Sequence, residues 1–280
     1  MKTNYNIYQF LIILSLLVAS CRKDTKPIPE NIKNYLHLSH TRTGINPLMD
    51  SVVEQVDYDQ FDMLWLGGDL AYLTSADEQT MQHVNSIFDI KSTNTLWALG
   101  NHDHTDLDRV SEFTQRPAYY TTSNNGITFV VLDTQDSLSN IVGAQKLLLN
   151  NVLDSITESS HLVILHHKLI WMYNNPNLEP QISSISNAGL GSCFYCINPN
   201  NFNSEVYPKL VDVKQRGIEV LCIGGDIGFK SKEFEYITNE GINFIASGIH
   251  YGKKNNKAVF FTHNLSRSTL TWEYKLITDL

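Results

Sequence analysis

The chain has 280 residues, of which 42% are hydrophobic and 10% aromatic, and its formal net charge at pH 7 is −8. This length allows one α/β domain of ordinary size or two small ones, and the apolar content excludes disorder for most of the chain. An acidic balance without a basic stripe argues against tight binding to nucleic-acid backbones.

The first twenty residues are predicted to be a bacterial signal peptide. A basic residue at position 2 precedes a short apolar core at residues 10–19, and the segment ends in Leu17-Val18-Ala19-Ser20-Cys21, which resembles a lipobox. In such sequences the cysteine becomes the lipidated N-terminus. We therefore expect a protein that begins at Cys21 and is anchored in the cell envelope, on the outer membrane or the periplasmic side. The apolar core is short for a membrane span, so an uncleaved helix is the lesser alternative.

Residues 21–32 are predicted to be a linker, and residues 33–280 a single folded domain. Pro27 and Pro29 favour an extended spacer in the linker. From there to about residue 223, buried strands alternate with helical patterns, which indicates βαβ crossovers and a mainly parallel sheet. Strands are expected at residues 34–38, 63–66, 95–99, 162–165 and 218–223, with a hairpin of residues 118–122 and 128–133 around Asn124-Asn125-Gly126.

Helices are predicted between these strands, at residues 47–56, 76–90, 107–115, 143–156 and 204–216. The clearest is the fourth, in which an apolar stripe at helical spacing is expected to face the core. This stripe consists of Ala144, Leu147, Leu148, Asn151, Val152 and Ile156. After residue 229, alternating apolar and polar residues predict strands at residues 233–238, 242–247, 258–263 and 269–275.

Three short polar segments follow apolar runs that are typical of buried strands. They are Leu66-Gly67-Gly68-Asp69, Gly100-Asn101-His102-Asp103 and Ile164-Leu165-His166-His167. Open α/β sheets bind ligands at strand ends, so these side chains are expected to converge. A carboxylate, an amide oxygen and an imidazole together suit Mn, Zn or Fe better than Ca.

In their order, these segments resemble the motifs of the calcineurin-like metallophosphoesterases, which are D-x-H, G-D, G-N-H-D, a lone His and G-H-x-H. Both outer motifs are altered in this chain. The first is replaced by Ser39-His40-Thr41-Arg42 and the last by Gly224-Gly225-Asp226-Ile227-Gly228. The resemblance implies an α/β fold, a four-layer αββα sandwich of two mixed β-sheets, in which the last four strands complete the second sheet.

The resemblance also implies a centre of one or two divalent ions, which would be Mn, Zn, Fe or Mg. One ion would be held by Asp69, Asn101, His166 and Asp226. The other would keep Asp69 and gain an imidazole from His40, but it would lose two ligands to Arg42 and Gly228. A guanidinium cannot coordinate a cation, so Arg42 is expected to offer its donors to a phosphate instead.

Catalysis is assigned by the resemblance to His102, which would protonate or stabilise the leaving oxygen, while Asp103 orients its ring. Simpler interpretations stay open, because aspartate and asparagine are also common turn residues. A hydrogen-bonded His40 beside an arginine that pairs with a carboxylate is an equal alternative to a ligand set. Three further histidines are expected to be solvated or hydrogen-bonded. Two of them, His104 and His167, adjoin motif residues, and the third, His250, follows another strand end.

Residues 168–203 form a long polar segment with weak periodicity. Its first part, residues 170–173, either overhangs the site as an aromatic cap or packs its rings inward. Cys193 and Cys196 form either a loop disulfide or two buried thiols.

These observations predict a metal-dependent phosphoester hydrolase anchored to the cell envelope. It would be a phosphatase or phosphodiesterase that acts on a phosphorylated small molecule or a surface phosphoester. The alternative is a catalytically silent binding or scaffold lipoprotein on the same fold. The expected partners are this phosphoester and, through the lipidated Cys21, a membrane, with no nucleic acid.

Overall fold

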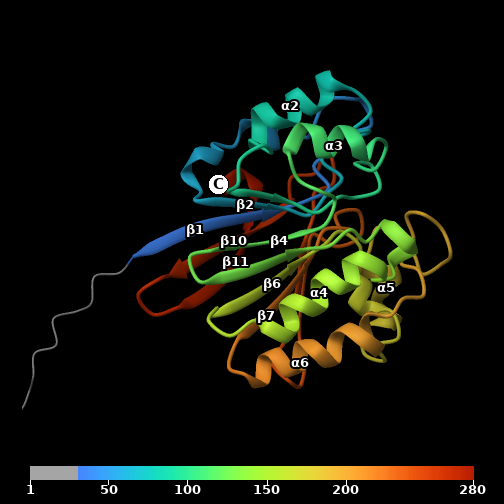
Figure 1. Ribbon diagram of the computed structural model, residues 1–280. Coiled ribbons are helices and arrows are strands. Elements are labelled where there is room, and N and C mark those ends of the chain that lie inside the picture. The colour runs from blue at the N-terminus through green and yellow to red at the C-terminus, as the bar shows by residue number, and fades with distance from the viewer. Residues whose placement is uncertain (1–30) are drawn as a thin grey trace, which may run out of the picture.

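Two β-sheets packed face to face form the centre of the computed structural model, which describes residues 31–280 (Figure 1). The first sheet has the strand order β11 (Thr269–Leu276), β10 (Lys257–Asn264), β1 (Ile32–Leu38), β2 (Met63–Leu66), β3 (Thr95–Trp97). The second has the order β4 (Tyr120–Asn124), β5 (Ile127–Val131), β6 (His161–Leu165), β7 (Glu219–Gly224), β9 (Asn243–Ser247), β8 (Glu233–Ile237). The predicted signal peptide and nearly all of the predicted linker lie outside the described residues.

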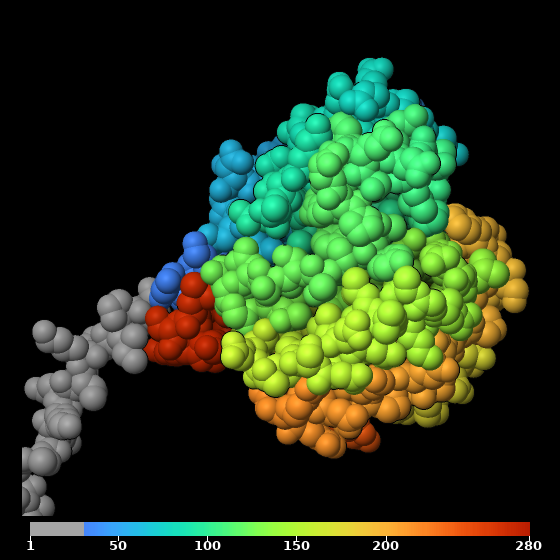
Figure 2. Space-filling view, in the orientation of Figure 1, coloured from blue at the N-terminus to red at the C-terminus, as the bar shows by residue number. Residues whose placement is uncertain are grey.

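Helices cover the outer face of each sheet and lie on opposite sides of the molecule (Figures 1 and 2). The first sheet is covered by α2 (Glu78–Phe88) and α3 (Leu107–Thr114), and the second by α4 (Gly143–Ser155), α5 (Ile182–Ile185) and α6 (Tyr207–Gln215). The 3-10 turns are Val53–Gln55, Tyr58–Gln60, Asp136–Ser139, Ile170–Met172, Glu179–Gln181 and Ile277–Asp279, and Phe202–Val206 is a π turn. Separate apolar clusters fill the space between the sheets and beneath each helix layer. The predicted αββα sandwich is therefore confirmed.

The last two strands correct the expected topology. We expected all four C-terminal strands to complete the second sheet, but only β8 and β9 do so. The strand β10 instead pairs antiparallel with β1, from Ile32 opposite Asn264 to His37 opposite Val259. The first sheet thereby gains β10 and β11, and β1 becomes an interior strand.

The helix predicted at residues 47–56 is reduced to the 3-10 turn Val53–Gln55. Acidic side chains in this segment bond to backbone amides and compete with helical hydrogen bonds. Asp50 accepts from the amide of Val52 at 3.0 Å, and Glu54 accepts from the amide of Met49 at 2.9 Å. These contacts hold the segment as a loop.

Helix α4 forms where the sequence predicts it, but it buries a different face. Its buried residues are Gln145, Leu149 and Leu153, while Leu147 of the predicted stripe is 62% exposed. The amide group of Gln145 explains the rotation, because it bonds to the backbone N–H of Asp133 at 2.7 Å and to its carbonyl oxygen at 3.1 Å. A polar residue at the helix start thus fixes which side chains face the sheet.

The parallel strands place the polar loops at one edge of the sandwich. Strands β1, β2 and β3 run parallel in the first sheet, and β5, β6, β7 and β9 run parallel in the second. Their carboxyl ends therefore face the same way within each sheet, and the loops that follow them meet across the interface between the sheets. None of the helices in the described part of the chain is long and apolar enough to cross a bilayer.

The buried ring of His37 is expected to make the fold sensitive to acid. Burial, with a smaller effect from His166, lowers the pKa of His37 from 6.5 to about 3. Between these values the unfolded chain binds a proton that the folded chain does not, so the stabilisation is complete above pH 6.5 and is lost as the pH falls towards 3.

The corresponding experiment compares the native chain with His37→Gln by urea denaturation at pH 7 and pH 5. Between pH 7 and pH 5, the unfolding free energy of the native chain is expected to fall by about 2 kcal/mol more than that of His37→Gln. An identical loss in both proteins would contradict a neutral, buried His37.

Candidate active site

A cavity of about 180 Å³ opens where the loops after the parallel strands meet. It is lined by His40, Arg42, Asp69, Asn101, His102, Asn187, Ala188, Tyr195, Asp226 and Phe229. Six of the predicted site residues are therefore brought together from both sheets. The other two, Asp103 and His166, do not line the cavity.

Close backbone approach builds the centre of this site. A Cβ atom on Gly100 would lie 2.2 Å from Oδ1 of Asp69 and 2.8 Å from Cε1 of His167, so only glycine fits at this position. Asp69 itself has a φ of 57°, a left-handed conformation that is uncommon for residues other than glycine. Such local strain concentrates at functional sites, and here it aims the carboxylate into the cavity.

The Asp69 carboxylate is the electrostatic centre of the site. Its Oδ1 accepts the backbone N–H of His102 at 3.0 Å. Its Oδ2 lies 3.5 Å from Nε of Arg42 and 3.7 Å from Nε2 of His40. Although burial raises the pKa of Asp69, the adjacent His167 and His40 outweigh it and hold the pKa below its ordinary value. The site therefore contains a fixed, buried anion.

His167, which the sequence analysis treated as a bystander, lies between two carboxylates. Its Nε2 is 3.6 Å from Oδ1 of Asp69 and 3.9 Å from Oδ1 of Asp226. Its Nδ1 lies 2.6 Å from the carbonyl oxygen of Gly67, which can only accept, so Nδ1 carries the proton. In the neutral ring with the proton on Nδ1, the Nε2 lone pair faces the carboxylates, and this buried atom has no hydrogen-bond partner. An electron-pair donor between two anions is arranged to receive a cation.

His166 does not take the place that the sequence analysis gave it. Its Nδ1 bonds to the carbonyl oxygen of Lys168 at 2.7 Å, and its ring packs edge-on against Trp171 with centroids 4.6 Å apart. Burial lowers the pKa of His166 to about 3, so the ring is neutral. The period of two along β6 contains the signal that was missed: Ile164 faces the outer helices and Leu165 faces the other sheet, so His166 points outward and His167 into the site.

Asp103 positions the loops and does not orient the His102 ring. Its carboxylate accepts the backbone N–H groups of Asp69 at 2.7 Å, Gly100 at 2.8 Å and Leu70 at 3.1 Å. The hydroxyl of Thr74 and the indole N–H of Trp97 also donate to it. Burial and the charge of Asp69 raise the pKa of Asp103. This carboxylate joins the loops after β2 and β3.

The His102 ring is oriented by a backbone carbonyl. Its Nδ1 lies 2.6 Å from the carbonyl oxygen of Tyr72 and therefore donates to it. The ring is half-buried at the wall of the cavity, next to Asn101. The remaining nitrogen, Nε2, is left to exchange a proton with a bound molecule.

Beside Asp69, the site presents the cationic side chain of Arg42. Nε of Arg42 is buried without a hydrogen-bond partner. At Gly228, which has a φ of 133°, a Cβ atom would lie 2.3 Å from the carbonyl oxygen of Ile249, so this position holds no side chain. Nδ1 of His40 donates to the same oxygen at 2.9 Å, and burial lowers the pKa of His40 to about 4. Of the ligands proposed for this position, Asp69 and His40 remain.

Lys168 contributes a further buried charge behind Asp226. Its side chain is fully buried, and its Nζ has no hydrogen-bond partner. Burial lowers the pKa of Lys168 to about 8, against the opposing effect of Asp226 and Asp133. Burial also raises the pKa of Asp226.

The structure agrees with some of the remaining expectations from the sequence and differs from others. His104 bonds to Asp133 at 2.9 Å, as expected of a hydrogen-bonded histidine, and His250 does not line the cavity. Trp171 is fully buried and stacks on Phe244 with centroids 5.1 Å apart, so it forms no cap over the site. Of the two alternatives left open for Cys193 and Cys196, the structure has the loop disulfide. It carries Tyr195 to the cavity, a placement for which we found no signal in the sequence.

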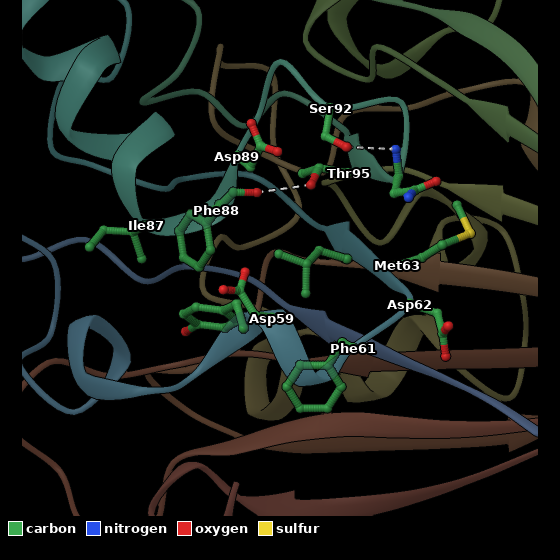
Figure 3. Close-up of a pocket in the computed structure, with 12 residues that line it drawn as sticks. Asp59, Phe61, Asp62, Met63, Ile87, Phe88, Asp89, Ser92 and Thr95 are labelled. Atoms are coloured by element: carbon green, nitrogen blue, oxygen red, sulfur yellow. Dashed lines mark hydrogen bonds between the residues drawn. The ribbon is translucent and has the colours of Figure 1, made fainter.

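A second cavity, of about 200 Å³, lies at the opposite ends of β2 and β3 and lacks the mixture of acidic, basic and histidine side chains found in the candidate active site (Figure 3). Its lining contains three carboxylates, Asp59, Asp62 and Asp89, but no histidine or basic residue. Asp62 already pairs with Lys33 at 2.7 Å and accepts the amide of Asn34 at 2.8 Å. This cavity lies where the strands begin, away from the loops that form the candidate active site.

The donors around Asp69 suit one metal ion and not two. Within residues 31–280, no group of three or more His, Cys, Asp or Glu side chains is arranged to hold a metal ion. However, the unpartnered Nε2 of His167 faces Asp69 and Asp226, and Asn101 lines the same cavity. Imidazole and oxygen donors of this kind are ligands that divalent transition metals accept. The Arg42 side offers no equivalent set.

Comparisons with known proteins relate this chain to other structures by fold. No family model matches the chain, and no curated protein matches it. A dimetal phosphatase from Danio rerio is 13% identical with a TM-score of 0.54, and the match covers 88% of this chain and 96% of that protein. The 5'-nucleotidase precursor from Thermus thermophilus is 12% identical with a TM-score of 0.43, covering 88% of this chain and 54% of that protein. With the sheet order and helix layers described above, the first match shows that this chain has the calcineurin-like metallophosphoesterase fold.

Proposed function

We propose that this protein is a metal-dependent phosphoester hydrolase with an asymmetric centre, in which one divalent ion lies beside a fixed arginine. The observation that carries the proposal is the unpartnered Nε2 of His167, which faces the carboxylates of Asp69 and Asp226. Arg42, on the other side of Asp69, supports the binding of an anion. A site with a cation position and a guanidinium complements the negative charge of a phosphoester.

The roles of the residues follow from their contacts. Asp69, Asp226, His167 and Asn101 would hold the ion, which would be Mn, Zn, Fe or Mg. When bound, such an ion polarises the phosphoryl group and lowers the pKa of bound water. The guanidinium of Arg42 offers paired donors to the phosphoryl oxygens.

His102 supplies the proton in this proposal. Its Nδ1–H is held by the carbonyl oxygen of Tyr72, so Nε2 is the atom that would protonate the leaving oxygen. The substrate is a small phosphate monoester or diester, free or on the cell surface, because the cavity has a volume of about 180 Å³.

We also propose that the chain is tethered to the cell envelope through a lipidated Cys21. The lipobox-like sequence supports this, and so does the start of β1 at Ile32, which leaves only a short segment between anchor and domain. The start of β1 would then lie nearest the membrane, and the active-site edge, which follows the other end of β1, would face away from the anchor.

A silent binding protein is the second candidate, and two observations favour it. Arg42 already faces Asp69 at 3.5 Å, and Lys168 is buried behind Asp226. These cations offset the carboxylates without any metal. In that case the site binds a phosphoester and does not turn it over.

The deciding experiment assays the purified chain with 4-nitrophenyl phosphate and bis(4-nitrophenyl) phosphate, with Mn, Zn or Mg added. We expect turnover that a chelator removes, with one ion per chain by metal analysis. Metal binding without turnover supports the silent protein, and two tightly held ions contradict the asymmetric centre. In expressing cells the activity is expected in the membrane fraction, and Cys21→Ala should move it to the soluble fraction.

A further inference from the structure

Two exposed aromatic side chains stand at the mouth of the candidate active site. Tyr195 and Phe229 both line the cavity, and they are 59% and 45% exposed. We call this pair the aromatic rim. Large apolar rings that stay accessible beside a concave polar site are typical of ligand contacts.

Phe229 is held in place before any ligand binds. Its backbone N–H donates to Oδ1 of Asn187 at 2.7 Å. Its ring packs edge-on against His40 at 4.6 Å and against His250 at 4.8 Å, both measured between centroids. The guanidinium carbon of Arg42 lies 5.8 Å from the ring centroid. The ring therefore stands directly beside the group that would bind the phosphate.

Tyr195 is held by a closed loop. The disulfide between Cys193 and Cys196 brackets it, and Nδ2 of Asn198 donates to the carbonyl oxygens of both cysteines, at 2.8 and 3.0 Å. The amide of Cys196 also donates to the carbonyl of Cys193 at 3.2 Å. A residue whose backbone is fixed in this way loses little backbone freedom when it contacts a ligand.

We infer that the aromatic rim selects phosphoesters whose alcohol part carries a planar aromatic ring. This inference rests on the proposed phosphoester site, because the ring would meet Tyr195 and Phe229 only when its phosphate lies on Arg42. A stacked ring contributes through its flat face and so accepts any planar group. Nucleosides and aryl alcohols share this chemistry.

Phe194 provides a matched control on the same loop. It is 45% exposed, like Phe229, but it does not line the cavity. Its ring lies 5.7 Å from that of His104 and 5.9 Å from Nζ of Lys168. Replacing it changes the same disulfide loop without removing a ring from the cavity.

The test measures binding of non-hydrolysable phosphonates to the full chain by calorimetry, with Mn²⁺ present. Phenylphosphonate is expected to bind about tenfold tighter than methylphosphonate, in line with the usual contribution of one aromatic stack. Tyr195→Ala should remove most of this preference, while Tyr195→Phe and Phe194→Ala should keep it. Methylphosphonate affinity should stay the same in all four proteins.

Each outcome decides between the two levels of the proposal. Equal binding of the two phosphonates by the native chain overturns the aromatic rim and leaves the phosphoester site standing. If neither phosphonate binds, the phosphoester site is wrong and the rim falls with it. A preference that survives Tyr195→Ala also overturns the inference. Adenosine 5′-monophosphate and phenyl phosphate, compared as competitors, then show whether a nucleoside or a simple aryl group fits better.

Discussion

Replacing Asp69 with asparagine is expected to lower kcat/KM for a chromogenic phosphate ester by about a thousandfold, the usual scale for losing one central electrostatic group. The substitution keeps the shape of the side chain and removes its negative charge. That charge is buried and faces Arg42, His40 and His167 at 3.5 to 3.7 Å. Without it, the ion loses a ligand and the cluster of nitrogen groups loses its counter-charge.

The experiment measures initial rates for the native chain and Asp69→Asn, together with metal content. Asp59→Asn is a matched control, because this carboxylate lines the cavity of Figure 3 and not the candidate active site. Its rate should equal that of the native chain. If Asp69→Asn keeps more than a tenth of the native rate, Asp69 is not at the centre of the reaction.

The substitution Asp103→Asn is expected to lower the free energy of unfolding by about 3 to 5 kcal/mol, because it removes a buried charged acceptor from several donors at once. The carboxylate accepts three backbone N–H groups, an indole N–H and a hydroxyl. An amide in its place would direct its own N–H groups at these donors. The loops after β2 and β3 would then separate.

Urea denaturation of the native chain, Asp103→Asn and Asp108→Asn tests this expectation. Asp108 is exposed in the first turn of α3, so its replacement should leave the stability close to native. A loss below 1 kcal/mol with a large fall in kcat would mean that Asp103 acts on His102 after all. The structural role is expected because His102 bonds to Tyr72 and not to this carboxylate.

Strand positions were largely predictable, because several are short apolar runs that end in a polar motif and those near the C-terminus alternate apolar and polar residues. Met63–Leu66 forms β2 as expected, and the Asn125-Gly126 turn joins β4 to β5 with φ values of 52° and 79°. These features depend on neighbours in sequence. The pairing of β10 with β1 depends on contact between distant segments, and nothing local distinguishes it from pairing in the second sheet.

The site was predictable in its location and less so in its details. The ordered motifs were sufficient to bring Asp69, Asn101 and Asp226 into one cavity. The structure places His167, and not His166, beside Asp69 and Asp226, and this placement follows the alternation along β6 continued past the end of the strand. The role of Asp103 depends on donors from the loop after β2 and from β3 with its following loop, which only a folded chain brings together.

The backbone at Gly228 limits how this protein can be changed. Because a Cβ atom there would meet the carbonyl oxygen of Ile249 at 2.3 Å, a histidine cannot be introduced at that position by side-chain replacement alone. Exchanging Arg42 for a coordinating residue would therefore yield an incomplete pair of ligands. A second metal position of the family's kind therefore requires a different backbone path at Gly228, which a single substitution does not provide.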